Sequence, residues 1–295
     1  MKWAKRLLLV FLVVLVIGLT GFLGRNLWVL HEEQREFTAL SERIEEERRN
    51  RDNREGTQTG RKTGTQAETK RQTEVTKDAE KGLSSGAGVM PGEELAVKRM
   101  KEDILPEYQE IYGENPDFAG WMMIEGTKIN YPIMQTLEEP EYYIHRDFNR
   151  EFSYAGTPFV GSGDVACDSD LFLYGHNMRN GTMFADLLKY QNEDYWKAHP
   201  VIALTTLWEH QEYEIFTAFH ASEEEWAQED GRFYQAMYGR GQKKEWAVLA
   251  LKAAGAYDTG ITPKPGTPLL YLVTCSYGRD GDRYVVAGAR KKSSD

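Results

Sequence analysis

The thiol of Cys275 is the first candidate for chemistry, because it ends an apolar run that starts at Leu269. A short apolar run of this kind predicts a buried strand. The end of a strand holds a nucleophile rigidly, while the loop that follows leaves room for a substrate. A lone cysteine more often fills space in a core, so Cys275 needs partners before it indicates catalysis.

Two further polar residues lie at the ends of apolar runs. His176 ends the run 171–176, and Arg283 begins the run 283–289 after the turn 277–282. A hairpin across this turn would return Arg283 to the side of Cys275. A thiol has a pKa of about 8.5 in solution and needs a base or a cation nearby to react near neutral pH. Positive charge also stabilises the oxyanion that forms when a thiolate attacks a carbonyl, so the three residues together fit acyl transfer.

Other kinds of chemistry find little support in the composition. The chain has two cysteines and six histidines without the spacing of a metal-ligand motif, so we expect neither a metal nor a cofactor. Two cysteines cannot form a disulfide-rich scaffold. A single bridge between Cys167 and Cys275 is allowed by the count but would consume the catalytic thiol, and we interpret Cys167 as a loop residue. The net charge of −10 argues against a nucleic-acid partner, because phosphate binding needs a basic surface.

Residues 1–30 predict a retained signal anchor. Lys2, Lys5 and Arg6 precede an uncharged, mostly apolar stretch at 7–24. A helix of about 20 apolar residues crosses a bilayer, and basic residues before it predict a cytoplasmic N-terminus. A cleaved signal peptide is the alternative, although its apolar region would normally be shorter. The prediction is a single-pass protein of the cell membrane with an extracellular catalytic domain.

Residues 31–92 are predicted to form a stalk helix followed by a disordered linker. Phe37, Leu40 and Ile44 recur at helical spacing, but this apolar stripe is thin and predicts a solvated helix. Residues 55–88 carry too few large apolar side chains to offset the entropy lost on ordering.

Residues 93–295 are predicted to form the catalytic domain. A helical pattern covers 93–112, and a stretch at 223–251 predicts one or two helices inserted between strands. Short apolar runs, separated by Gly, Pro, Asn and Asp, lie at 120–124, 129–134, 171–174, 201–207, 213–219, 269–274 and 284–289. Many short strands with turn residues between them favour a mainly β barrel or sandwich.

Several short motifs occur in order along this region. They read NPDFAGW at 115–121, GTKINYP at 126–132, YYIHRDF at 142–148, LYGHNM at 173–178, YDTG at 257–260, TCSY at 274–277 and RYVV at 283–286. Together they resemble the motifs of class B sortases, the cysteine transpeptidases of Gram-positive bacterial surfaces, and particularly those of clostridia. The resemblance covers about 94–290. Residues 161–164 depart from the family's pattern, so an unusual loop is expected before Asp170.

The resemblance implies both a fold and a reaction. The fold is an eight-stranded sortase-type β-barrel, mainly β, with N-terminal helices and a helical insertion before the Cys275 strand. Cys275 would cleave a C-terminal sorting signal after Thr and form a thioacyl enzyme, His176 would be the general acid and base, and Arg283 would hold the substrate backbone or the oxyanion. Residues beside the reactive positions are expected to bind substrate: Thr274, Ser276, Tyr277 and Asn177. The implied partners are surface proteins with a sorting motif and an amine of the lipid-linked peptidoglycan precursor.

Three alternatives stay open at this point. A thiol peptidase would use the same three residues but release the acyl group to water. A binding module on the same barrel would have lost the chemistry, yet all three reactive positions are occupied here. A pilus-polymerising sortase commonly carries a C-terminal membrane span, whereas this sequence ends in charged and small polar residues at 290–295.

Overall fold

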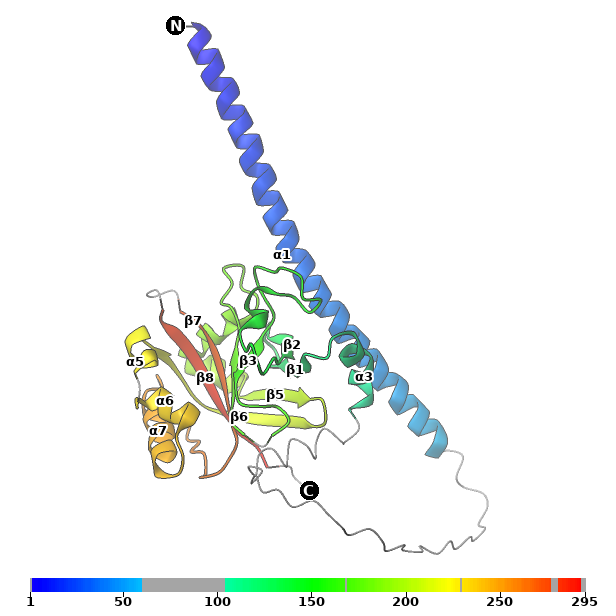
Figure 1. Ribbon diagram of the computed structural model, residues 1–295, viewed down its shortest axis with the longest axis vertical. Helices are drawn as coiled ribbons and strands as arrows, with labels where there is room; N and C mark the ends of the chain where they lie inside the picture. Colours follow the sequence, from blue (N-terminus) through cyan, green and yellow to red (C-terminus); the bar gives the residue numbers. More distant parts are fainter. Residues whose placement is uncertain (1, 60–103, 168, 229, 277–280, 293–295) are drawn as a thin grey trace, which may run out of the picture.

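Eight strands close into a barrel in the order β1-β2-β3-β4-β7-β8-β6-β5 (Figure 1). The structure is a computed structural model that describes residues 2–59, 104–167, 169–228, 230–276 and 281–292. The strands are β1 (Phe118–Met123), β2 (Asn130–Met134), β3 (Phe159–Ser162), β4 (Leu171–Tyr174), β5 (Val201–Thr206), β6 (His210–Ala221), β7 (Leu269–Cys275) and β8 (Arg283–Arg290). The predicted eight-stranded barrel is therefore confirmed.

The central strand β7 is buried on both faces, which explains its unbroken apolar sequence. Successive side chains of a strand point to opposite faces. Leu270 and Leu272 accordingly pack in the barrel interior, while Leu269, Tyr271 and Val273 pack in a second core outside the barrel. Because both cores hold β7, its exposed end at Cys275 is fixed in position.

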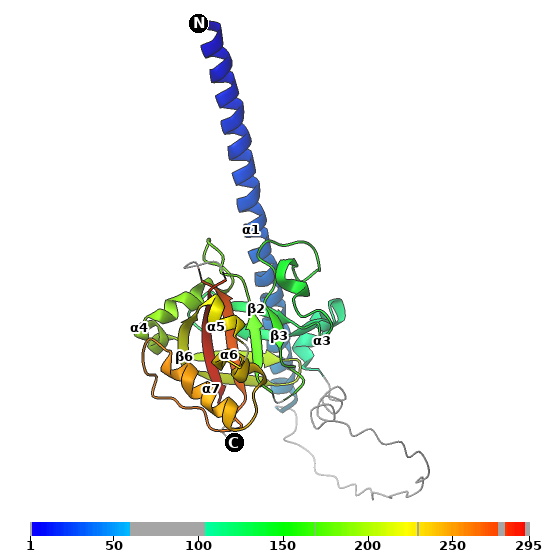
Figure 2. The same cartoon turned by 60° about the vertical axis from the view of Figure 1, so that its left-hand side comes forward.

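The second core is formed by the insertion between β6 and β7. It contains the three helices α5 (Glu223–Ala227), α6 (Arg232–Tyr238) and α7 (Gln242–Ala253), where the sequence predicted one or two. Figure 2 shows these helices lying over the barrel strands, and Phe233, Ala247 and Leu251 pack there against the outer face of β7 and β8. The predicted helical insertion before the Cys275 strand is confirmed.

An ion pair joins the insertion to the barrel beside β4. The Nζ atom of Lys244 on α7 lies 2.6 Å from a carboxylate oxygen of Asp170, whose other oxygen accepts a hydrogen bond from the Leu269 amide at 3.1 Å. Burial raises the pKa of Asp170, and Lys244 opposes this effect. The loop before Asp170, which the sequence predicts to be unusual, therefore ends at a buried carboxylate. The positive charge of Lys244 stabilises the ionised form of this carboxylate.

Replacing Lys244 by alanine should leave this carboxylate buried without its cation. We expect the free energy of unfolding to fall by about 2 kcal/mol at neutral pH, below the usual cost of breaking a buried pair, because the Lys244 side chain is 34% exposed. The loss should shrink as the pH falls and Asp170 takes up a proton. Urea unfolding at several pH values measures both effects, with the exposed neighbour Lys243→Ala as the control. A pH-independent loss would contradict this explanation.

Two N-terminal helices, α1 (Lys2–Thr59) and α3 (Pro106–Glu114), lie beside the barrel (Figure 1). Phe37, Leu40 and Ile44 of α1 are buried in the barrel-side core, and the Phe37 ring meets the Tyr131 ring edge-on at 5.5 Å. Arg43 of α1 forms ion pairs with two glutamates of α3. The stripe that predicts a solvated stalk is thus buried against the barrel instead.

The predicted location in a membrane is corrected by the described helices. None of the helices among these residues is both long and apolar enough to cross a bilayer. The single-pass location predicted for this chain is therefore not borne out by the described residues. Of the linker predicted at 55–88, residues 55–59 belong to the end of α1 and the rest lies outside the described residues. The division at 1–30, 31–92 and 93–295 stays a prediction.

Candidate active site

Cys275 and Arg283 face each other across the β7–β8 pair. The two strands are antiparallel, and their register places Cys275 opposite Arg283. Side chains at opposed positions of such a pair have Cβ atoms about 5 Å apart. The guanidinium of Arg283 donates a 2.7 Å hydrogen bond to the Gly281 carbonyl, while Cys275 is an exposed free thiol. The hairpin therefore places Arg283 directly opposite Cys275 on the neighbouring strand.

The strand β4 brings His176 to the same end of the barrel. It runs parallel to β7, with Tyr174 opposite Val273, and the Gly175 amide continues the ladder to the Val273 carbonyl at 3.2 Å. The hydroxyl of Thr274 then donates to the Gly175 carbonyl at 2.7 Å. These hydrogen bonds hold Gly175, which precedes His176, against Val273 and Thr274, which precede Cys275.

The imidazole of His176 is held by the 3-10 helix η1 (Tyr142–His145). Its Nε2 atom lies 2.9 Å from the Ile144 carbonyl oxygen. The rings of His176 and His145 stack with centroids 5.2 Å apart and an interplanar angle of 22°. Burial lowers the pKa of His176, the charge of His145 lowers it further, and the hydrogen bond to Ile144 opposes both effects.

All three residues line one cleft of about 650 Å³. The insertion contributes Trp226, Met237 and Tyr238 to the lining, and the loop 138–141 contributes three glutamates. A cleft of this size, lined by both apolar and charged side chains, has the dimensions of a small-ligand or peptide site. The insertion is therefore part of the site as well as part of the outer core.

The residues predicted to bind substrate have different surroundings. Thr274 is buried but borders the cleft, Ser276 is buried with its amide bonded to the Asp282 carbonyl at 2.9 Å, and Tyr277 lies outside the described residues. Asn177 donates from its Nδ2 atom to the Cys275 carbonyl at 3.0 Å. Asn177 thus contacts the backbone of the nucleophile, and substrate binding by these four residues stays a prediction.

Replacing Asn177 by alanine removes this hydrogen bond at the nucleophile. We expect kcat to fall roughly tenfold, since a hydrogen bond of this kind contributes about 1 kcal/mol and its loss lets the end of β7 move. Steady-state kinetics test this, with Asn180→Ala on the same loop as the control. An unchanged kcat in the Asn177 variant would show that the end of β7 is fixed without it.

Sequence reasoning missed three residues of the site. His145 stacks on His176, and Tyr174 and Trp226 form adjoining parts of the cleft with their rings 6.4 Å apart. His145 and Tyr174 lie within the quoted motifs, so the motifs contained the signal. Trp226 has no comparable signal, because an isolated tryptophan in a helical stretch is equally typical of a core.

The described residues contain no group of three or more His, Cys, Asp or Glu side chains that could hold a metal ion. Cys167 and Cys275 are both free thiols, so no bridge consumes the nucleophile. The sulfur of Cys167 lies 3.8 Å from a carboxylate oxygen of Asp164, outside the cleft. The cleft thus brings together a thiol, an imidazole and a guanidinium group from Cys275, His176 and Arg283.

Comparison with known proteins identifies the family. A family model described as the sortase domain matches residues 122–291. Sortase B of Listeria monocytogenes is 27% identical over 199 residues, which are 66% of this chain and 78% of the relative. The crystal structure of Clostridium perfringens sortase B superposes with a TM-score of 0.55 at 25% identity, covering 62% of this chain and 99% of that one. A Staphylococcus aureus sortase B–substrate complex, at 21% identity and a TM-score of 0.57 over 69% of this chain and 95% of that one, shares the fold.

The sortase-domain match extends from the end of β1 through β8 and includes the other seven strands of the barrel in full. It also includes the positions of His176, Cys275 and Arg283. Because this match spans more than half of the sequence, the chain belongs to the sortase family, and its relatives named above are sortase B proteins.

Proposed function

We propose that this protein is a cysteine transpeptidase that cleaves a C-terminal sorting signal after Thr and transfers the surface protein to an amine of the lipid-linked peptidoglycan precursor. The observation that carries the proposal is the register of β7 and β8, which pairs the exposed thiol of Cys275 with Arg283 in the cleft that also holds His176. Membership of the sortase family supports the same reaction class.

The first half-reaction forms a thioester. The thiolate of Cys275 attacks the carbonyl carbon of the scissile bond, and the Arg283 guanidinium stabilises the negative charge on the carbonyl oxygen. The C–N bond then breaks, and His176 gives its proton to the departing amine. The products are an acyl group on the sulfur and a free C-terminal fragment.

The second half-reaction reverses the proton transfer. An incoming amine attacks the thioester carbonyl, His176 takes the amine proton, and the sulfur leaves as the thiolate. Water could replace the amine, which would make the protein a thiol peptidase. The exposure of Cys275 allows either acceptor to reach the thioester, so the reaction products must distinguish the two.

A peptide assay makes this distinction. The protein is incubated with peptides that carry a Pro-containing motif ending in Thr-Gly or Thr-Asn, with and without a saturating oligoglycine or diamine acceptor. We expect a peptide–amine adduct that replaces the slower hydrolysis product as the amine concentration rises. Hydrolysed peptide without any adduct at saturating amine would contradict transpeptidation, and an unreacted peptide in every mixture would favour a binding module.

A further inference from the structure

The helix η1 contacts His176 through both its backbone and a side chain. The Ile144 carbonyl lies 2.9 Å from Nε2, and the His145 ring stacks on the imidazole at 5.2 Å. A backbone carbonyl only accepts hydrogen bonds, so Nε2 must donate. The neutral imidazole therefore has its hydrogen on Nε2, which leaves Nδ1 as the nitrogen that gains and loses a proton.

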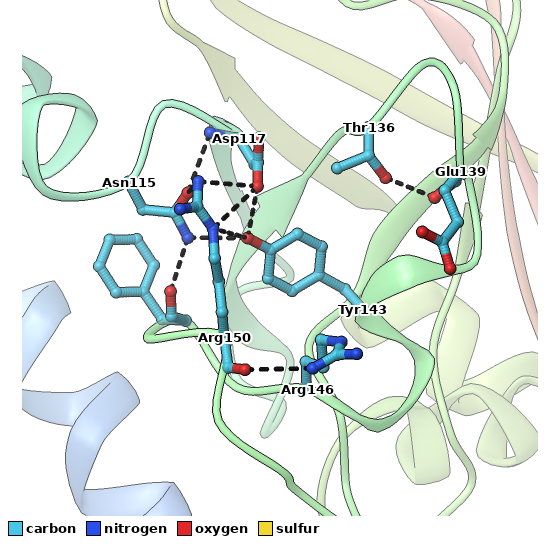
Figure 3. Close-up of polar contacts among 8 residues, drawn as sticks. Asn115, Asp117, Thr136, Glu139, Tyr143, Arg146 and Arg150 are labelled. Carbon is cyan, nitrogen blue, oxygen red and sulfur yellow. Dashed lines mark hydrogen bonds and ion pairs between the residues drawn. The ribbon is translucent and has the colours of Figure 1, made fainter.

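A polar network anchors η1 through the side chain of Tyr143 (Figure 3). The Tyr143 side chain is fully buried, and its hydroxyl donates to Asp117 and accepts from Asn115, each at 2.8 Å. Arg150 donates to the same carboxylate at 3.0 Å and to the Asn115 amide oxygen at 2.9 Å. Burial raises the pKa of Tyr143 to about 12, so its hydroxyl keeps the proton that it donates.

The backbone of η1 is fixed as well. The Thr157 amide donates to the Tyr143 carbonyl and the Ser153 amide to the His145 carbonyl, both at 3.1 Å. Gly156 has a φ of 60°, and a Cβ atom there would lie 2.3 Å from the Ile144 carbonyl oxygen. The loop 153–157 can therefore pack this closely only with glycine at position 156, and the carbonyl that faces His176 has little freedom to move.

We infer that η1 is the positioning element of the general acid and base: the Tyr143 network fixes η1, and Ile144 and His145 hold His176 as the Nε2–H tautomer, so that proton exchange with the substrate takes place at Nδ1. The inference rests on the proposed catalytic role of His176. Tyr143 and His145 are positioning residues in this account, because they act on the reaction through His176.

Other titratable or charged groups line the same cleft as this histidine and are part of any pH effect. They are Glu138, Glu139 and Glu141 from the loop before η1, Tyr174 from β4, Tyr238 from α6, Cys275 from β7 and Arg283 from β8. Of these groups and the residues of η1, only His145 has a charge that contributes to the lowered pKa of His176. Exchanging His145 for an uncharged ring should therefore raise that pKa.

Nitrogen NMR of protein labelled with ¹⁵N-histidine tests the tautomer directly, without substrate. We expect the neutral His176 ring to show a protonated Nε2 and an unprotonated Nδ1. Tyr143→Phe should mix the two tautomers and lower kcat/KM about tenfold, with kcat carrying the loss and KM for the peptide unchanged. Tyr142→Phe is the matched control, because the contacts of Tyr142 with Tyr143 and Arg146 are made by its ring, which phenylalanine retains.

The His145 variants separate positioning from simple packing. His145→Phe keeps a ring and removes the charge, so the pH limb that belongs to His176 should move to higher pH. His145→Gln removes the ring and should also lower kcat. If both variants lower only the melting temperature and leave the limb and kcat unchanged, His145 is a packing residue and the inference fails.

A wild-type His176 with its hydrogen on Nδ1 would overturn the inference, as would a Tyr143→Phe protein with an unchanged tautomer and unchanged kcat. The tautomer is measured without any acceptor or peptide. A protein that hydrolyses peptides instead of transferring them would refute the proposed function while leaving the NMR result intact, so the two failures are distinguishable.

Discussion

Replacing Cys275 by serine is expected to lower the rate of peptide transfer by at least about 10⁴-fold, because Cys275 is the only thiol that lines the cleft among the described residues and a hydroxyl is a much weaker nucleophile. The fold should not change. Cys275 is the exposed last residue of β7 and packs in neither core, so the free energy of unfolding should stay within about 0.5 kcal/mol of the wild type.

The control for this prediction is the other thiol of the chain. Cys167→Ser should retain full activity, because Cys167 lies outside the cleft. Alkylation of the wild type should abolish activity, and alkylation of the Cys167→Ser protein should do the same. A Cys275→Ser protein that still transfers peptide at a comparable rate would remove the thiol from the mechanism.

Replacing His176 by alanine is expected to lower kcat about 10³-fold, the usual contribution of a group that both donates and accepts the reacting proton. The lowered pKa of His176 should also be visible in the pH profile of the reaction. The limb of the pH profile that reports His176 should lie below the pH at which an exposed histidine titrates, and it should disappear in the variant. Kinetics between about pH 4 and 9 measure both effects.

His220→Ala is the matched control, since His220 is an exposed residue of β6 that contacts the Tyr284 ring. Its pH profile should match the wild type. If the His176 variant keeps the complete profile with only a modest loss of rate, then the imidazole orients the substrate and another group carries the proton.

The barrel could be predicted from the sequence largely because its apolar strands are short and bounded by turn residues. The exception is β3, which has four residues and a register shift between Val160 and Ser162. The glycine in this bulge is required by packing: a Cβ atom at Gly161 would lie 2.5 Å from the Tyr174 ring. From the sequence alone, a glycine inside a short apolar run predicts a turn, because the sequence does not show that the Tyr174 ring packs against it.

The helical parts of the chain show a different limit. Phe37, Leu40 and Ile44 predict a helix, which is present, but spacing alone does not reveal that the stripe has a partner. The insertion contains three helices because the sharp breaks at Asp230 and Gly241 both have positive φ values. Residue periodicity carries no signal for breaks of this kind.

The candidate site was predictable where a strand end fixes a side chain. Cys275, Arg283 and His176 each follow or begin an apolar run, and the strand register brings them to one end of the barrel. The surroundings of His176 were not predictable in the same way. They come from η1, a four-residue 3-10 helix without apolar periodicity, whose position depends on a polar network with the start of β1.

Intact-protein mass spectrometry during turnover tests the central claim most directly. The protein is mixed with an excess of a sorting-signal peptide in the absence of an amine and quenched in acid. The intact mass is measured first, and a digest of the same sample then locates any added mass. We expect an added mass equal to the acyl part of the peptide, located on Cys275, which disappears within one turnover when an amine is supplied and reappears as the peptide–amine product. An enzyme that consumes the peptide without this adduct, or an adduct on another residue, would contradict it.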